Sequence, residues 1–168
     1  MTEVPPRRCW DSCCLIAIIK DEQPHAPTLR RLLEDAQNKN IEIVVSTMVI
    51  TEVVRPRSSA APVDRARFES VIRNFFESDL IQVISHDRAI AEIGRELCWK
   101  HGLHPRDSIH FATALREKCA VLETTDGQLH GYDGKIDGLQ VRLPKWEGQM
   151  LLKEQAHLKK GGASETGA

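Results

Sequence analysis

Residues 107–126, DSIHFATALREKCAVLETTD, predict a helix followed at once by a strand. From Asp107 to Lys118 the apolar side chains recur at helical spacing, so that one side of the predicted helix faces inward. Ala120-Val121-Leu122 is a short apolar run, typical of a buried strand, and it leads into Asp126. A helix that feeds a buried strand in this way favours an α/β fold with a mostly parallel sheet.

The same alternation of short apolar runs and longer amphipathic segments extends over the rest of the chain. Besides the strand at 120–122, strands are predicted at 7–10, 41–45, 80–84 and 139–143. Helices are predicted at 13–19, 28–38, 46–54, 63–76, 88–100 and 107–118. Ser12 is the expected N-cap of the first helix, and Gly102 is expected to end the fifth. The pattern therefore predicts five strands joined by helical crossovers.

Length and composition indicate one globular domain. The chain has 168 residues, of which 41% are hydrophobic and 28% are charged. We expect a folded domain over residues 1–146 and a polar, disordered C-terminal tail over residues 147–168. The longest apolar run, Cys13 to Ile19, is too short to span a bilayer, and Asp11 interrupts any secretory leader. We therefore expect a cytoplasmic protein with reduced, mostly buried cysteines.

Two aspartates follow predicted strands directly. Asp11 comes after the first strand and Asp126 after the fourth. If the strand order is 3-2-1-4-5, these strands flank the point where connections leave for opposite faces, which is where ligands bind in such sheets. Glu52 lies on the helix that leaves the second strand, and Asp107 lies in the first turn of its own helix. All four acids can therefore reach one crevice.

Carboxylates gathered in one crevice repel each other, and the usual reason for such a cluster is a hard cation. Mg²⁺ and Mn²⁺ prefer oxygen ligands from carboxylates, water and substrate phosphate. Such ions activate water and stabilise in-line displacement at phosphorus. Taken singly, each acid has a simpler reading, as a helix cap, a turn former or half of a surface ion pair.

Other polar residues have two open readings. Ser12 and Thr125 either orient a metal-bound water or phosphate, or serve as a helix cap and a turn hydrogen bond. His110 is expected to pack beside its helix rather than to act in catalysis. Four arginines near the acidic edge either contact RNA phosphates or form a solvated loop: Arg55, Arg57, Arg65 and Arg67. The net charge of −1 argues against a protein that coats nucleic acid without cleaving it.

Four segments together resemble the PIN domain family. They are Trp10 to Ile16, Thr51-Glu52-Val53, Arg106 to Leu115 and Leu122 to Asp126, in the family's order. The resemblance runs from about residue 8 to residue 144, and the segment from Arg106, in which an aspartate opens an alanine-rich helix, is the most specific.

The resemblance implies a three-layer α/β/α sandwich and a Mg²⁺- or Mn²⁺-dependent endoribonuclease with Asp11, Glu52, Asp107 and Asp126 as catalytic metal ligands. Many small members are VapC-type toxins of toxin–antitoxin pairs. That likeness implies a homodimer and a cognate antitoxin, which often places a basic side chain among the acids. One departure concerns the residues after Asp126. Many members have a further acid there, whereas this chain has Gly127-Gln128-Leu129, so the metal site is expected to be leaner.

Two other functions compete with this one. The first is a PIN-fold module that binds RNA or protein without cleaving, which the retention of all four acids argues against. The second is a phosphatase on a doubly wound sheet. That enzyme would need a nucleophilic aspartate motif and a lysine in the cleft, and the sequence offers neither.

Overall fold

The computed structural model of the chain describes residues 4–54 and 65–148. Its sheet has five parallel strands in the order β3-β2-β1-β4-β5, which confirms the predicted order. The strands are β1 (Arg7–Trp10), β2 (Glu42–Ser46), β3 (Ile81–Ile84), β4 (Val121–Glu123) and β5 (Gln140–Arg142). The first strand of the chain is thus the central strand of the sheet, with β2 on one side and β4 on the other.

The helices agree with the predicted ones in number and order, and differ at their ends. They are α1 (Ser12–Lys20), α2 (His25–Gln37), α3 (Met48–Glu52), α4 (Arg65–Glu77), α5 (Arg88–His101) and α6 (Pro105–Arg116). Helix α6 begins at Pro105, two residues before the predicted start, because proline fits the first helical position and the His104 side chain accepts a hydrogen bond from the Arg106 N–H. A short 3-10 helix, η1 (Leu129–Tyr132), occupies part of the stretch predicted as turns.

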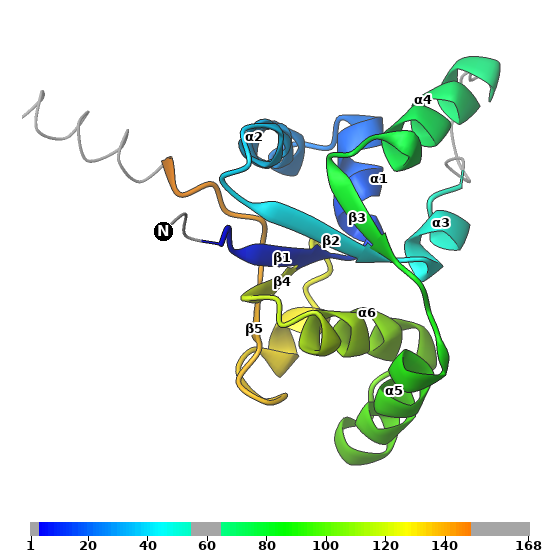
Figure 1. Cartoon of the computed structure of the whole chain (residues 1–168), viewed down its shortest axis with the longest axis vertical. Coiled ribbons are helices and arrows are strands. Elements are labelled where there is room, and N and C mark those ends of the chain that lie inside the picture. Colours follow the sequence, from blue (N-terminus) through cyan, green and yellow to red (C-terminus); the bar gives the residue numbers. More distant parts are fainter. Residues whose placement is uncertain (1–3, 55–64, 149–168) are drawn as a thin grey trace, which may run out of the picture.

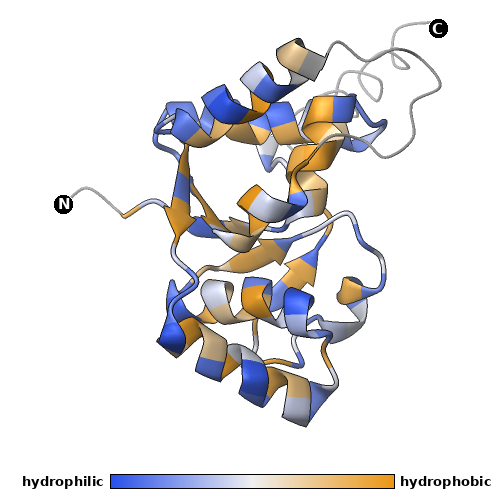
Figure 2. Ribbon diagram, turned by 90° about the vertical axis from the view of Figure 1, so that its right-hand side faces the viewer, coloured by the Kyte–Doolittle hydropathy of each residue, from blue (hydrophilic) through white to orange (hydrophobic). Residues whose placement is uncertain are grey.

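Helices cover both faces of the sheet, giving the predicted three layers (Figure 1). Helices α1, α2 and α4 lie on one face, and α5 and α6 lie on the other (Figure 1). Figure 2 shows mostly hydrophobic strands between helices that mix hydrophilic and hydrophobic residues. Side chains alternate across each strand, so Cys9 of β1 packs in the core beneath α5 and α6, whereas Trp10 packs in the core beneath α1 and α2.

A buried ion pair joins the two central strands. Arg8 Nη1 lies 2.9 Å from Glu123 Oε1, and the indole N–H of Trp10 donates to Glu123 Oε2 over 2.9 Å. The Glu123 side chain is completely buried. The same Arg8 nitrogen donates to the carbonyl oxygen of Lys145, so the segment after β5 is held against β1.

The three tryptophans have different environments. Trp146 packs at the edge of the core under α1 and α2, and its indole N–H donates to Asp35 Oδ2 over 3.0 Å. Trp99 on α5 is 70% exposed, with the guanidinium of Arg95 4.9 Å from its ring centroid. Trp146 thus lies at the edge of the core, whereas Trp99 lies on the surface.

The predicted tail lies largely outside the described residues, which end at residue 148. All five cysteines are free, and Cys9, Cys14 and Cys119 are buried, as expected. Among the helices of the described ranges, none has the length and apolar character needed to cross a membrane.

Candidate functional site

Asp11 follows β1 directly and caps α1. Its backbone is extended, and its Oδ1 atom accepts hydrogen bonds from the N–H groups of Cys13 (3.0 Å) and Cys14 (3.3 Å). The expectation that Ser12 caps this helix was therefore wrong, because Ser12 is already the first helical residue. The other carboxylate oxygen, Oδ2, accepts from the hydroxyl of Thr124 over 2.5 Å.

Burial dominates the electrostatics of Asp11. The residue is 3% exposed, and burial raises the pKa of its carboxyl above the usual range. The hydrogen bonds from Thr124 and from the amides of the first turn, together with the charge of His110, act in the opposite direction without cancelling the effect of burial. Burial thus makes the ionised form of Asp11 less stable than that of a carboxylate in water.

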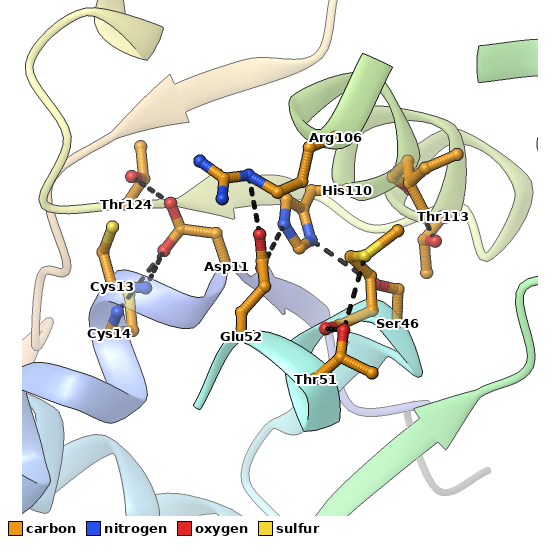
Figure 3. A network of polar contacts seen from close by, with 12 residues as sticks. Asp11, Cys13, Cys14, Ser46, Thr51, Glu52, Arg106, His110, Thr113 and Thr124 are labelled. Carbon is orange, nitrogen blue, oxygen red and sulfur yellow. Dashed lines mark hydrogen bonds and ion pairs between the residues drawn. The ribbon is translucent and has the colours of Figure 1, made fainter. Parts of the chain in front are cut away.

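Glu52 is the last residue of α3, and both of its carboxylate oxygens contact α6 (Figure 3). Oε1 lies 2.9 Å from Arg106 Nε, and Oε2 lies 3.0 Å from His110 Nε2. Burial alone would raise the pKa of Glu52, but the hydrogen bond and charge of His110, a hydrogen bond from Ser12 and the charge of Arg106 outweigh it and lower the pKa. Glu52 is therefore ionised at neutral pH.

Three of the predicted acids raise the pKa of one thiol, that of Cys13. Cys13, in the first turn of α1, has its pKa raised to about 12, first by burial and then by the negative charges of Asp11, Asp126 and Glu52. These carboxylates come from the ends of β1 and α3 and from the loop after β4. The structure therefore brings Asp11, Glu52 and Asp126 together around the start of α1, at the carboxyl edge of the sheet.

A threonine that the sequence analysis did not single out joins two of these acids. Thr124 is completely buried; its hydroxyl donates to Asp11 and accepts a hydrogen bond from the backbone N–H of Asp126 over 3.0 Å. The carboxylate of Asp126 in turn accepts from the Gln128 N–H over 2.9 Å. Thr125, which was expected to supply a hydroxyl, makes no hydrogen bond to any other described residue.

Thr124 could have been identified from the register of β1 and β4. Trp10 of β1 pairs with Glu123 of β4, so the next residues along, Asp11 and Thr124, stand side by side. Register is a property of two strands paired in space, and the sequence shows only that both strands exist.

Asp107 is the least connected of the four predicted acids. It lies half-buried in the first turn of α6, and its side chain forms no hydrogen bond or ion pair with another residue of the described ranges. It precedes His110 by three positions, which places the two side chains on the same side of the helix. Asp107 is therefore one helical turn from the ring that contacts Glu52.

The remaining predicted residues are only partly described. Ser12 donates to Glu52, as the lowered pKa of that acid reflects. Arg55 and Arg57 lie outside the described residues, as do the side chains of Arg65 and Arg67 on α4. Asp133, a later acid in the stretch before β5, accepts a hydrogen bond from the Val141 N–H over 2.8 Å and so supports the turn before β5.

The donor set has the chemistry of a site for a hard cation. Carboxylate and hydroxyl oxygens are the ligands that Mg²⁺ and Mn²⁺ prefer. Within residues 4–54 and 65–148, however, no three His, Cys, Asp or Glu side chains are arranged to hold a metal ion. Figure 3 shows Asp11 turned toward Thr124 and the amides of α1, and Glu52 turned toward Arg106 and His110. Both carboxylate oxygens of Glu52 thus have a protein partner.

Comparison with solved structures supports the fold. The chain resembles Mycobacterium tuberculosis VapC20, described as a sarcin-ricin loop cleaving toxin, with TM-score 0.58 and 16% identity over 74% of this chain and 93% of that one. It also resembles VapBC2 from Rickettsia felis bound to a promoter DNA fragment, with TM-score 0.58 and 16% identity over 80% of this chain and 96% of that one. A toxin–antitoxin complex from Klebsiella pneumoniae aligns with TM-score 0.57 and 19% identity over 82% and 98%.

Sequence comparison identifies the family. A search of curated proteins found no match for this chain. The family model of the PIN domain matches residues 8–135, which run from β1, without its first residue, through η1 and include all four predicted acids. The chain therefore belongs to the PIN domain family.

Proposed function

We propose that this chain is a Mg²⁺- or Mn²⁺-dependent endoribonuclease. The observation that carries the proposal is the convergence of Asp11, Glu52 and Asp126, the charges of which all reach the Cys13 thiol at the carboxyl edge of the parallel sheet. Membership of the PIN domain family and the fold shared with a toxin described as cleaving the sarcin-ricin loop support the same reaction class.

In this proposal some residues bind the metal ion, and others position the residues that bind it. Asp11, Glu52, Asp107 and Asp126 would hold the metal ion, which supplies an activated water and stabilises charge at phosphorus. Thr124 fixes Asp11 relative to Asp126, because one buried hydroxyl bonds to both. Ser12 supports Glu52. An unstacked RNA strand suits this site, because no second strand then blocks the scissile phosphate.

Arginines are proposed to hold the RNA backbone. Arg106 is 61% exposed and lies beside Glu52, where its guanidinium can contact a phosphate of a bound strand. Arg55, Arg57, Arg65 and Arg67 are proposed to extend this contact along the strand. With a net charge of only −1, the chain depends on such local positive charge to bind RNA.

We further propose that the chain is the toxin of a type II toxin–antitoxin pair in the cytoplasm, acting as a homodimer. The structures from Rickettsia felis and Klebsiella pneumoniae contain a toxin with its antitoxin, and this chain shares their fold. Burial raises the pKa of Asp11, and a positive charge beside it, from the metal ion or from a basic side chain of an antitoxin, would favour its ionised form.

Metal-dependent cleavage is the test. The purified chain should cleave a single-stranded RNA in Mn²⁺ or Mg²⁺ and stop in EDTA, and Asp126→Asn should be inactive in either metal because a ligand is lost. A matched control is Thr113→Val, since Thr113 is buried on α6 and its hydroxyl bonds only to the Ile109 carbonyl oxygen of its own helix. Cleavage that continues unchanged in EDTA would refute the proposal.

The second candidate is a PIN-fold module that binds RNA or protein without cleaving. One observation favours it: both oxygens of Glu52 are already paired with Arg106 and His110, so the acid is neutralised without a metal ion. RNA binding that is undiminished by EDTA, together with no cleavage in Mn²⁺ or Mg²⁺, would establish this alternative.

A further inference from the structure

We propose that His110 is a positioning residue for Glu52: it keeps Oε2 while Oε1 exchanges Arg106 for the metal ion. This inference rests on the proposed metal-dependent function and concerns a residue that the sequence analysis set aside as packing. It is carried by the unequal burial of the two groups that contact one carboxylate.

His110 is enclosed and bonded on both sides of its ring. Its side chain is 2% exposed. Nε2 lies 3.0 Å from Glu52 Oε2, and Nδ1 lies 3.4 Å from the hydroxyl oxygen of Ser46, which is completely buried at the end of β2. The ring therefore links α6 to β2 and to α3, the two elements that set where Glu52 stands.

The hydrogen bond to Glu52 does not depend on the charge of the ring. In the neutral ring, Nδ1 accepts from the Ser46 hydroxyl and Nε2 donates to Glu52. In the charged ring both nitrogens donate, and the Ser46 oxygen can accept. In either state the Nε2–H group points at Oε2, so His110 holds the carboxylate at any pH at which the protein is folded and Glu52 is ionised.

Arg106 holds the other oxygen far less firmly. Its side chain is 61% exposed, against 2% for His110, and solvent screens an exposed ion pair. Arg106 precedes His110 by one helical turn on α6, so the two groups reach Glu52 from the same side (Figure 3). An incoming cation can therefore displace the guanidinium from Oε1 and leave the bond between His110 and Oε2 intact.

A fixed partner is needed because Glu52 is otherwise weakly restrained. It ends the helix α3, which runs only from Met48 to Glu52. A glutamate has several rotatable bonds, and immobilising them at the moment of metal binding weakens affinity. Hydrogen-bond partners that orient ligating carboxylates commonly change metal affinity by about 10–100-fold when removed.

The test measures binding of Mn²⁺ alone, by titration calorimetry in the absence of RNA. His110→Gln places an amide N–H where it can reach Oε2, whereas His110→Asn has the same chemistry on a shorter side chain that reaches only toward Ser46. We expect His110→Gln to bind Mn²⁺ nearly as tightly as the parent. We expect His110→Asn to bind it about 10–100-fold more weakly.

Arg106→Ala should not weaken Mn²⁺ binding, in contrast to His110→Asn. It removes a cation that competes for Oε1, so Mn²⁺ affinity should stay the same or rise. Thr113→Val, a change at a buried polar residue of the same helix, should leave affinity unchanged. Melting temperatures without metal should agree between His110→Gln and His110→Asn, which separates metal binding from folding.

Three results overturn the inference, and they are distinguishable. If the parent binds Mn²⁺ and His110→Asn binds it equally well or more tightly, His110 is only a counter-charge or a packing residue, and the proposed nuclease function stands. If the parent binds no Mn²⁺ at all, the proposed function fails and takes this inference with it. Equal loss of affinity in His110→Gln and His110→Asn would also refute a role in orienting Oε2.

Discussion

Replacing Asp11 separates its role as a helix cap from its proposed role as a metal ligand. Asp11→Asn keeps the shape and an oxygen that can accept from the Cys13 and Cys14 N–H groups, but removes the charge. Asp11→Ala removes the oxygens as well. In the Ala variant the first turn of α1 loses its cap, and the buried hydroxyl of Thr124 loses its acceptor.

The expected stabilities of the metal-free variants follow from these contacts. Losing an N-cap costs about 1 kcal/mol, and leaving a buried hydroxyl without a partner costs about 1–3 kcal/mol. At about 2–4 °C per kcal/mol for a chain of this size, Asp11→Ala should melt at least about 4 °C below the parent. Asp11→Asn also removes the acceptor of the Thr124 hydroxyl, because its NH2 group replaces Oδ2, but it keeps the cap and removes the buried charge. It should therefore melt close to the parent and above Asp11→Ala.

The raised pKa of Asp11 shows that removing its charge, as in Asp11→Asn, by itself makes the folded state more stable. A carboxyl whose pKa is higher in the folded than in the unfolded chain binds protons more tightly when folded, so its ionisation destabilises the fold. That cost is absent below the unfolded pKa and complete above the folded pKa. Above the unfolded pKa the parent carries this cost, and asparagine carries none.

Thermal melts at neutral pH, with and without Mn²⁺, provide the assay. At a concentration 100 times its dissociation constant, Mn²⁺ should stabilise the parent by about 2.7 kcal/mol and should stabilise Asp11→Asn much less. If Asp11→Asn instead melts as low as Asp11→Ala, and the parent gains nothing from Mn²⁺, Asp11 is only a cap and the reasoning fails.

Three further predictions concern other charges. Because the pKa of Glu52 is lowered, the stability from its pairing with His110 and Arg106 is present above the ordinary glutamate value and is lost as the pH falls through the folded value. Urea titrations at several acidic pH values should show this loss in the parent, and Glu52→Gln should lack it. If the free energy of unfolding changes equally with pH in the parent and in Glu52→Gln, the pairing is contradicted. Glu123→Gln removes the nearer and fully buried of the two carboxylates that contact Arg8 and should cost about 3–5 kcal/mol in urea denaturation; a cost within about 0.5 kcal/mol, as for an ordinary surface substitution, would mean that water reaches the pair. Replacing Arg55, Arg57, Arg65 and Arg67 with alanine should weaken RNA binding about equally across sequences and flatten its salt dependence in filter-binding assays; an unchanged slope would mark them as solvated surface.

The sheet was predictable because apolar residues recur with different spacings in strands and in helices. Short apolar runs such as 41–45 and amphipathic segments such as 88–100 leave little choice but alternating strands and helices. Helix ends were less predictable, because they depend on single caps. Asp11, rather than Ser12, caps α1, since its extended backbone turns the carboxylate onto the first-turn amides.

The acids of the site were predictable from their place after strands, but their partners were not. Thr124 meets Asp11 through the register of β1 and β4. His110 and Arg106 meet Glu52 because α6 packs against α3, a contact between residues more than fifty positions apart. Such contacts depend on how helices and strands pack against each other, which the periodicity of the sequence does not indicate.

The position of β1 at the centre of the sheet sets the order in which the site can be completed during synthesis. The hydrogen bond between Thr124 and Asp11 spans 113 positions, and Asp126 lies farther still along the chain. At roughly 5–20 residues per second, a ribosome needs on the order of ten seconds to advance from one aspartate to the other. Throughout that time the nascent chain has its first acid and lacks its last. Incomplete chains released before β4 therefore cannot assemble the acid cluster, whatever metal is present.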